Sequence, residues 1–267
     1  NMLRKHAKIE PERFYYHCDQ LGMLVWQDMV NGGSAYKHWF VTYLATLMNW
    51  NHISFSDDEK HAGLLSRLHP EGKDEFRREI TETIAFLYNH PSIVVWVPFN
   101  EGWGQFDALA VCEQIRTLDS SRLVDHASGW FDQKGGDILS LHYYFLKLKF
   151  KPESKRAAAL TEFGGYSLSI PGHSCCKKVY GYKKFNSTGT LTYGYIDLIR
   201  QTILPAVKKG IGATVYTQLS DIEEETNGIY TYDREICKID PDTLRKWNRA
   251  LKEAGECKTY ADHPTDH

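Results

Sequence analysis

The chain carries a series of short, continuous apolar segments, each of which ends in side chains able to do chemistry. One of them covers residues 93–97 and leads into Asn100 and Glu101. Continuous rather than alternating apolar residues are typical of strands buried on both faces, as in a parallel sheet. The polar groups at the predicted strand ends are Arg4 and His6, Gln27 and Asp28, Asn100 and Glu101, Asp125 and His126, His142 and Tyr143, Glu162, and Gln218.

Between these segments, apolar residues recur at three- and four-residue spacing, which indicates amphipathic helices. The pattern predicts helices over residues 72–89, 106–118, 191–209 and 241–254, with Pro205 kinking or breaking the third. Alternating strands and helices give βαβ units. Polar groups at the carboxyl end of strand after strand favour an α/β fold of the TIM (β/α)8 type, because those ends meet at one mouth. The pattern contains seven strands, so we expect a barrel that lacks its first βα unit.

Composition excludes several classes of protein. The 267 residues hold 32 Lys and Arg against 34 Asp and Glu, and no basic run would bind nucleic acid or an anionic membrane. The apolar segments are much shorter than the ~18 residues of a membrane helix. None of the 6 cysteines forms a C-x-x-C pair, so we expect mostly buried free thiols rather than a zinc ribbon or a thioredoxin motif.

We expect residues 1–254 to form one catalytic barrel domain and residues 255–267 a tail of unknown role. Within the barrel, residues 31–71 form a long connection rich in aromatic side chains. Connections above ~15 residues without periodicity are usually functional or disordered, and the aromatic residues indicate order. Two interpretations stay open for this segment: a lid or wall over the mouth, or a packed external insertion.

Glu101 and Glu162 each end an apolar segment, where burial would otherwise exclude a charge. One such glutamate is more often an ion-pair partner than a catalyst. Two of them at the mouth of one barrel fit glycoside hydrolysis, which needs two carboxyl groups about 5–5.5 Å apart when configuration is retained. One carboxyl group must be protonated to donate to the leaving oxygen, and the other must be ionised to attack.

The sequence around these glutamates resembles glycoside hydrolase family 2, which includes β-galactosidases, β-glucuronidases and β-mannosidases. The resemblance rests on Phe99-Asn100-Glu101 after an apolar strand and on Thr161-Glu162-Phe163-Gly164-Gly165 sixty-one residues later. Residues 1–4 and 18–25 are similar to the second and third barrel strands of the family, and residues 228–234 to the stretch after the eighth. The resemblance therefore extends from residue 1 to about residue 254.

This resemblance implies a retaining exo-β-glycosidase that removes terminal β-linked sugars. Glu101 matches the acid/base and Glu162 the nucleophile, while Asn100 matches the residue that binds the 2-hydroxyl of the sugar. Arg4 matches an arginine that pairs with the nucleophile and keeps it ionised. Tyr143 matches a tyrosine beside the nucleophile, with Tyr144 as the alternative. The complete set of predicted substrate-binding residues is Asn100, Arg4, His142, Tyr143, Asp28, Trp130 and Gln218.

Several positions depart from the family pattern. His6 follows Arg4 by two residues rather than three, and Tyr216-Thr217-Gln218 lacks the tryptophan often found at the end of strand eight. Gln27-Asp28-Met29-Val30 lacks the Glu and His that bind magnesium in some β-galactosidases, so we expect no catalytic metal and no other cofactor.

A further departure from the family pattern restricts which sugar the site is expected to accept. Glucuronidases resemble one another in an Asn-x-Lys motif that grips the sugar carboxylate, and Glu225-Thr226-Asn227 stands in its place, with Glu223 and Glu224 adding negative charge. A uronate would be repelled there. We therefore expect β-galactosidase-like activity, with β-mannosidase and β-glucuronidase as alternatives.

Two hypotheses compete with this one. A non-catalytic carbohydrate-binding barrel would keep the aromatic mouth of Trp103, Trp130 and Tyr143. A metal-dependent hydrolase would use Asp125, His126 and His142. The family also implies β-sandwich domains before the barrel in a longer protein. The sequence leaves the oligomeric state and the compartment open.

Overall fold

The structure is a computed structural model that describes residues 1–37, 39–51, 53–144 and 148–259. All seven predicted strands are present as β1, β2, β3, β4, β5, β6 and β9. The chain divides into two compact units. The first comprises Asn1–His142 and Ser154–Ala157, and the second comprises Tyr143–Glu153 and Ala158–His267.

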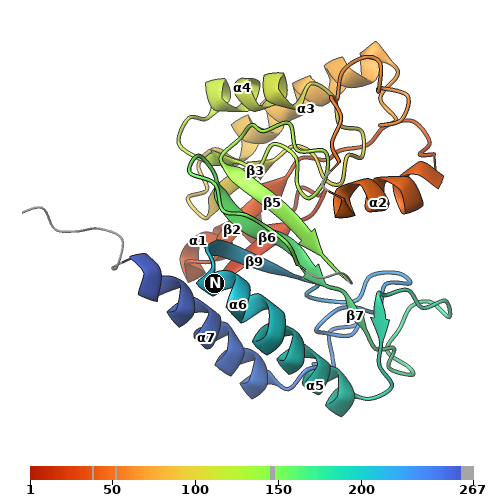
Figure 1. The fold of residues 1–267 in the computed structure, drawn as a ribbon, viewed down its shortest axis with the longest axis vertical. Coiled ribbons are helices and arrows are strands. Elements are labelled where there is room, and N and C mark those ends of the chain that lie inside the picture. The colour runs from red at the N-terminus through yellow and green to blue at the C-terminus, as the bar shows by residue number, and fades with distance from the viewer. Residues whose placement is uncertain (38, 52, 145–147, 260–267) are drawn as a thin grey trace, which may run out of the picture. The chain divides into compact units, whose positions relative to one another are not determined.

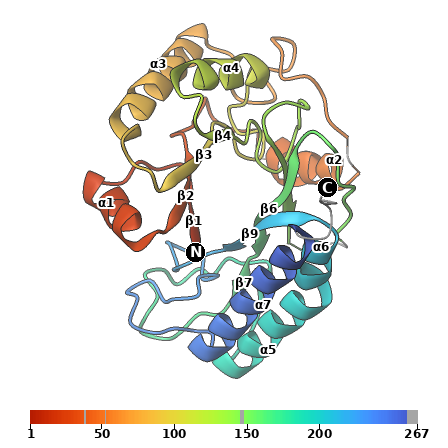
Figure 2. The same cartoon turned by 90° about the vertical axis from the view of Figure 1, so that its left-hand side faces the viewer.

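The first unit contains a parallel sheet of β1 (Met2–Lys5), β2 (Leu24–Asp28), β3 (Ile93–Val97) and β4 (Leu123–Val124), in that order (Figure 2). Strand β5 (Ile138–Tyr143) reaches the end of this unit. Helices α1 (Glu12–Leu21), α3 (Pro70–Leu87) and α4 (Ala108–Leu118) lie between successive strands along the chain. The parallel pairing confirms the βαβ arrangement.

Helix α1 is an element that periodicity did not predict. Only Tyr15 and Cys18 of its ten residues are buried, so its apolar stripe is too short to stand out in the sequence. The helix ends at Gly22, whose φ of 63° is the left-handed conformation that glycine adopts most readily at a helix C-terminus.

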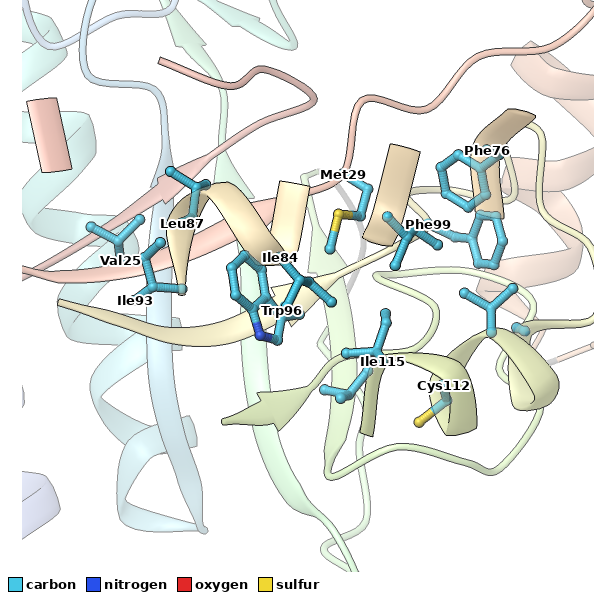
Figure 3. Packing of buried hydrophobic residues seen from close by; sticks show 14 of the residues in the cluster. Val25, Met29, Phe76, Ile84, Leu87, Ile93, Trp96, Phe99, Cys112 and Ile115 are labelled. Atoms are coloured by element: carbon cyan, nitrogen blue, oxygen red, sulfur yellow. The ribbon is translucent and has the colours of Figure 1, made fainter. Parts of the chain in front are cut away.

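The core of the first unit lies between the sheet and helices α3 and α4 (Figure 3). The predicted stripe of α3 is buried, from Phe76 to Leu87, and packs with Val25 and Ile93 of the strands. Trp96 is fully buried, and its indole Nε1 donates to Asp119 Oδ2 at 2.9 Å. The strands whose carboxyl ends carry the predicted polar residues, β2 and β3, are thereby anchored by a packed core.

The long connection over residues 31–71 is ordered and packed. It contains a π-helical turn η1 (Phe40–Leu44) and helix α2 (Ala45–Trp50). Phe40 and Leu65 pack with Trp130 and Phe131, and the rings of Phe40 and Phe131 are stacked with centroids 6.1 Å apart. The connection therefore forms a wall against the segment that follows β4, and residues 38 and 52 lie outside the described residues.

In the second unit, β6 (Ala157–Gly164) pairs in parallel with β9 (Ile211–Thr217), and β7 (Tyr166–Ser167) pairs with β8 (Lys183–Lys184). The predicted third helix is continuous through α5 (Thr188–Leu198), the π-helical turn η2 (Ile199–Ile203) and α6 (Leu204–Lys208). It lies beside α7 (Pro241–Thr259) (Figure 1).

Two helix predictions in this unit need refinement. Pro205 does not end the helix, because it stands in the first turn of α6 after a π-helical turn, where a missing N–H is tolerated. Helix α7 continues past residue 254 to Thr259, so the first part of the predicted tail is helical. Residues 260–267 lie outside the described residues. No helix among the described residues has the length and apolar character needed to cross a bilayer.

Candidate active site

The two predicted catalytic glutamates belong to different units, Glu101 to the first and Glu162 to the second. The partners given below for each glutamate belong to the same unit as that glutamate.

Glu101 is held by a short backbone bridge to the segment after β4. Its N–H donates to the Ser128 carbonyl at 2.9 Å, and the Ser128 N–H donates to the Phe99 carbonyl at 2.9 Å. The φ of Glu101 is 51°, in the left-handed region that few residues other than glycine adopt, and Gly102 follows with a φ of 73°. Such conformations persist where the surroundings impose them, and they cluster at functional sites.

Arg4, Asp28 and Asn100 form one buried group. The Arg4 guanidinium donates to both Asp28 carboxylate oxygens at 3.0 Å and to Asn100 Oδ1 at 2.8 Å. Burial opposes ionisation of Asp28, but the Arg4 charge and a hydrogen bond with His6 outweigh it and hold the pKa of this carboxyl below its ordinary value. Asn100 is thus oriented by a buried ion pair.

His142 contacts the predicted acid/base directly. Its Nδ1 lies 2.8 Å from Glu101 Oε1, and its Nε2 lies 3.2 Å from Ser128 Oγ. The His142 side chain is 1% exposed and that of Glu101 12%. His142 was predicted as a substrate-binding residue, and within its unit the structure places it beside Glu101.

The hypothesis of a metal site at Asp125, His126 and His142 finds little support. His126 Nε2 accepts the Gln133 N–H at 3.1 Å, while His142 lies against Glu101. Within the described parts of the chain, these three residues are not among the groups whose ligand atoms all lie within 4.8 Å of one another. Burial raises the pKa of Asp125 above its ordinary value, and the opposing charge of Arg4 does not cancel this shift.

A second cluster of possible ligands lies at the surface of the other unit. His173 Nδ1 is 2.6 Å from Asp233 Oδ2 and 3.9 Å from Glu235 Oε2. Asp233 also accepts a hydrogen bond from the Thr231 hydroxyl at 2.6 Å. These contacts stabilise a surface turn.

In the second unit, Glu162 lies on β6 and receives a hydrogen bond from the Tyr144 hydroxyl. The same hydroxyl lies 3.2 Å from Thr217 Oγ1 at the end of β9, and the Tyr144 ring stacks on Tyr182 with centroids 4.0 Å apart. The sequence left Tyr143 and Tyr144 open as the tyrosine beside the nucleophile. Tyr144 is the one that contacts Glu162, whereas Tyr143 lies close to Tyr166.

Gln218 follows β9 directly and joins the segment that replaces the uronate motif. Its Nε2 donates to Glu225 Oε2 at 2.9 Å and to Asn227 Oδ1 at 2.6 Å. The Asn227 Nδ2 also donates to Glu225 Oε2 at 3.4 Å. The Glu225 carboxylate is thus held by two amide side chains.

Trp130 is more buried than a sugar platform would be. It is 9% exposed and packs with Phe40 and Leu65. With the Asn49 amide in the orientation that satisfies both groups, Asn49 Oδ1 accepts from Trp130 Nε1 at 2.9 Å. The structure therefore gives Trp130 a packing role, and its contact with substrate stays a prediction.

Three neighbours of the candidate site were not predicted from the sequence. Ser128 and Ser140 lie beside His142, and Tyr182 lies against Tyr144. Serines and tyrosines are common in loops, and none of these three ends a predicted strand. No signal in a single sequence separates them from other polar residues.

Parallel βαβ units with polar side chains at the carboxyl ends of their strands are typical of a TIM-barrel domain. Residues 9–204 match the family described as glycosyl hydrolases family 2, TIM barrel domain, and the chain belongs to this family. Its fold is accordingly that of a TIM barrel, as predicted.

Curated relatives carry more than one activity in their names. A β-galactosidase of Leuconostoc mesenteroides is 25% identical over 97% of this chain and 23% of its own length. A β-mannosidase B of Thermothelomyces thermophilus is 32% identical over 35% of this chain and 8% of its own length.

Solved structures support the fold. A β-D-glucuronidase of Dictyoglomus thermophilum superposes with a TM-score of 0.62 at 14% identity, covering 93% of this chain and 44% of the other. A β-galacturonidase of Eisenbergiella tayi gives a TM-score of 0.59 at 17% identity, covering 96% and 44%. The chain thus spans less than half of these proteins.

Proposed function

We propose that the protein is a retaining exo-β-glycosidase that works by double displacement. Glu101 protonates the glycosidic oxygen while Glu162 attacks the anomeric carbon, which breaks the bond to the leaving group and forms a glycosyl ester. Glu101 then takes a proton from water as the water oxygen attacks the same carbon, and Glu162 leaves as a carboxylate. This cycle consumes one water and restores both carboxyl groups.

One observation carries this proposal: each strand-end glutamate has its own orienting partner. His142 contacts Glu101 at 2.8 Å, and the Tyr144 hydroxyl donates to Glu162. Membership in a family of glycosyl hydrolases supports the same two roles. By this proposal, Arg4 additionally pairs with Glu162 and favours its ionised form.

Among sugars, we propose a neutral glycone, with β-galactosides first. The Glu225 carboxylate is held by Gln218 and Asn227, and it would repel the carboxylate of a uronic acid. The relative matched over 97% of the chain is named a β-galactosidase. β-Mannosidase activity is the second candidate, supported by the relatives named β-mannosidase B. By the same charge argument, β-glucuronidase activity ranks below both.

We further propose that β-sandwich domains accompany this barrel in the whole protein, because the chain covers 44% of the solved relatives. Its partner in the reaction is a glycoside substrate. The proposal includes no metal and no other cofactor.

A panel of nitrophenyl β-glycosides tests the function, with β-galactoside, β-mannoside and β-glucuronide in parallel. We expect one neutral glycoside to be hydrolysed, and Glu162→Ala to abolish that hydrolysis. Glu82→Gln, at an exposed position of α3, is the matched control and should leave the rate unchanged. The first-formed product, followed by NMR, should be the β anomer. If the unchanged protein and Glu162→Ala both bind sugar without hydrolysing any glycoside, the result would instead support the non-catalytic barrel.

A further inference from the structure

We propose that His142 is a positioning residue that assigns the catalytic proton of Glu101 to one of its two carboxyl oxygens. In this proposal Nδ1–H of His142 donates to Oε1 of Glu101, which places the transferable proton on Oε2. The inference rests on the proposed function, because it concerns the acid/base step of that reaction.

The contact is short and well shielded from solvent. His142 Nδ1 lies 2.8 Å from Glu101 Oε1, and the imidazole is 1% exposed. A hydrogen bond to a carboxylate in such a site is stronger than one in water, because water does not compete for either partner. The orientation of the Glu101 carboxyl group is therefore set by the imidazole.

The two ring nitrogens of His142 contact different groups, a carboxylate oxygen at Nδ1 and a serine hydroxyl at Nε2. Ser140 Oγ accepts the Gly129 N–H at 3.3 Å and lies 3.2 Å from Ser128 Oγ. Ser128 Oγ in turn lies 3.2 Å from His142 Nε2. A serine hydroxyl can donate or accept, so Ser128 is compatible with either role of Nε2. An ionised carboxylate only accepts, so a neutral imidazole that hydrogen-bonds to Oε1 carries its proton on Nδ1 and leaves Nε2 to accept from the Ser128 hydroxyl.

The backbone fixes the place of the ring as well. Gly129 has a φ of 84°, and a Cβ added there would lie 2.6 Å from both Cγ and Nδ1 of His142. The imidazole thus lies against the glycine backbone in space that no other residue type would leave. Gly129 follows Ser128, so one short segment positions both the ring and its hydrogen-bond partner.

One tautomer serves both steps of the reaction. When Glu101 is protonated, its carbonyl-type oxygen Oε1 accepts from Nδ1–H and its hydroxyl oxygen Oε2 faces the leaving group. When Glu101 is ionised, the same Nδ1–H stabilises the carboxylate, and Oε2 takes the proton from water. His142 neither gains nor loses a proton in the cycle, so its task is to orient the acid.

The dependence of rate on the leaving group tests this role. A dinitrophenolate departs without a proton, whereas an alkoxide needs one, so loss of acid catalysis slows only the second. We expect His142→Ala to lower kcat/KM by about 10- to 100-fold for a methyl glycoside, and by less than about 3-fold for the dinitrophenyl glycoside of the same sugar. His142→Asn, whose amide can donate from near the position of Nδ1, should recover much of the methyl glycoside rate.

The control is His126→Asn, an equally buried histidine that lies against Asp132 and Gln133 rather than Glu101. Any loss from this variant should be the same for both substrates. Equal losses from His142→Ala on both substrates would overturn the proposal. So would a ¹⁵N NMR spectrum showing the His142 proton on Nε2.

Glu101→Gln separates failure of this inference from failure of the proposed function. If Glu101→Gln loses activity selectively on the methyl glycoside and His142→Ala does not, the acid/base assignment stands and the positioning role of His142 is wrong. If Glu101→Gln shows no such selectivity, the proposed function itself fails, and the role of His142 with it.

Discussion

Arg4 and Asp28 are joined by two parallel hydrogen bonds, from Nε to Oδ1 and from Nη2 to Oδ2, each 3.0 Å long. Both side chains are at most 3% exposed, and the guanidinium also reaches Asn100. The sequence predicted that Arg4 pairs with the nucleophile. Within its own unit its partners are Asp28 and Asn100, and the pairing with Glu162 stays a prediction.

Asp28→Ala should destabilise the protein strongly, because it leaves the Arg4 guanidinium buried without its carboxylate. We expect the free energy of unfolding to fall by about 3–5 kcal/mol, measured by urea denaturation. Asp242→Ala is the control, since Asp242 forms an exposed pair with Arg245. It should change stability by less than about 1 kcal/mol. Similar small effects from both variants would contradict the structural role of the buried pair.

Tyr144→Phe should slow the reaction without unfolding the protein. The substitution removes the hydroxyl that donates to Glu162 and keeps the ring that stacks on Tyr182. A hydrogen bond to a charged group is worth about 1.5–3 kcal/mol, so kcat/KM should fall about 10- to 100-fold. Tyr143→Phe is the matched control and should have little effect. The opposite ranking would make Tyr143 the functional tyrosine.

Gly129→Ala should displace the His142 ring while leaving its chemistry intact. The new methyl group would lie 2.6 Å from the ring, and the φ of 84° disfavours alanine as well. We expect a loss of about 1–3 kcal/mol in stability from the strain, together with the selective loss on methyl glycosides predicted for His142→Ala. Gly22→Ala has a similar φ of 63° and no neighbour within 4 Å. This control should cost stability alone.

Asp119 should make the free energy of unfolding depend on pH in the acidic range. Burial opposes its ionisation, but hydrogen bonds from Ser121, Arg122 and Trp96 lower its pKa from 3.8 to about 2. A group whose pKa is lower in the folded state stabilises the fold at pH values above its unfolded pKa. This stabilisation is lost as the pH falls through the folded pKa. Asp119 should therefore contribute about 2 kcal/mol at neutral pH, lost between about pH 4 and pH 2.

The comparison of Asp119→Asn with the unchanged protein tests this contribution. The difference in unfolding free energy, measured by denaturation at several pH values, should be largest at neutral pH and shrink below about pH 4. A difference that does not change with pH would assign the effect to packing instead.

Lys238 should be essential to the loop that carries Glu225 and Asn227. Its Nζ donates to Asp221 Oδ1 at 2.6 Å and to the carbonyls of Thr226 and Leu168 at 2.9 and 3.0 Å. Burial lowers the pKa of Lys238 against the pull of Asp221, so this ion pair depends on these contacts. Lys238→Met should cost about 3–5 kcal/mol by leaving Asp221 buried. Lys252→Met, at an exposed pair, should cost almost nothing.

Much of the fold could be predicted because burial leaves a periodic trace in the sequence. The stripe from Phe76 to Leu87 predicted α3, and the run over residues 93–97 predicted β3 with Glu101 beyond its end. Helix α1 was missed because it buries only two residues. The connection over residues 31–71 was predicted to be ordered, but its π-helical turn and helix were not, since its apolar residues pack without a regular period.

The sequence by itself determined the strand ends, the two glutamates and the class of chemistry they indicate, because these depend on residue type and local pattern. Only the tertiary structure decided which partners surround them. The bond from Arg4 to Asn100 spans 96 residues, and that from His142 to Glu101 spans 41. The tertiary structure also shows that Tyr144, rather than its neighbour Tyr143, donates a hydrogen bond to Glu162. Such contacts follow from the register and packing of strands distant in the chain, and local pattern carries no record of them.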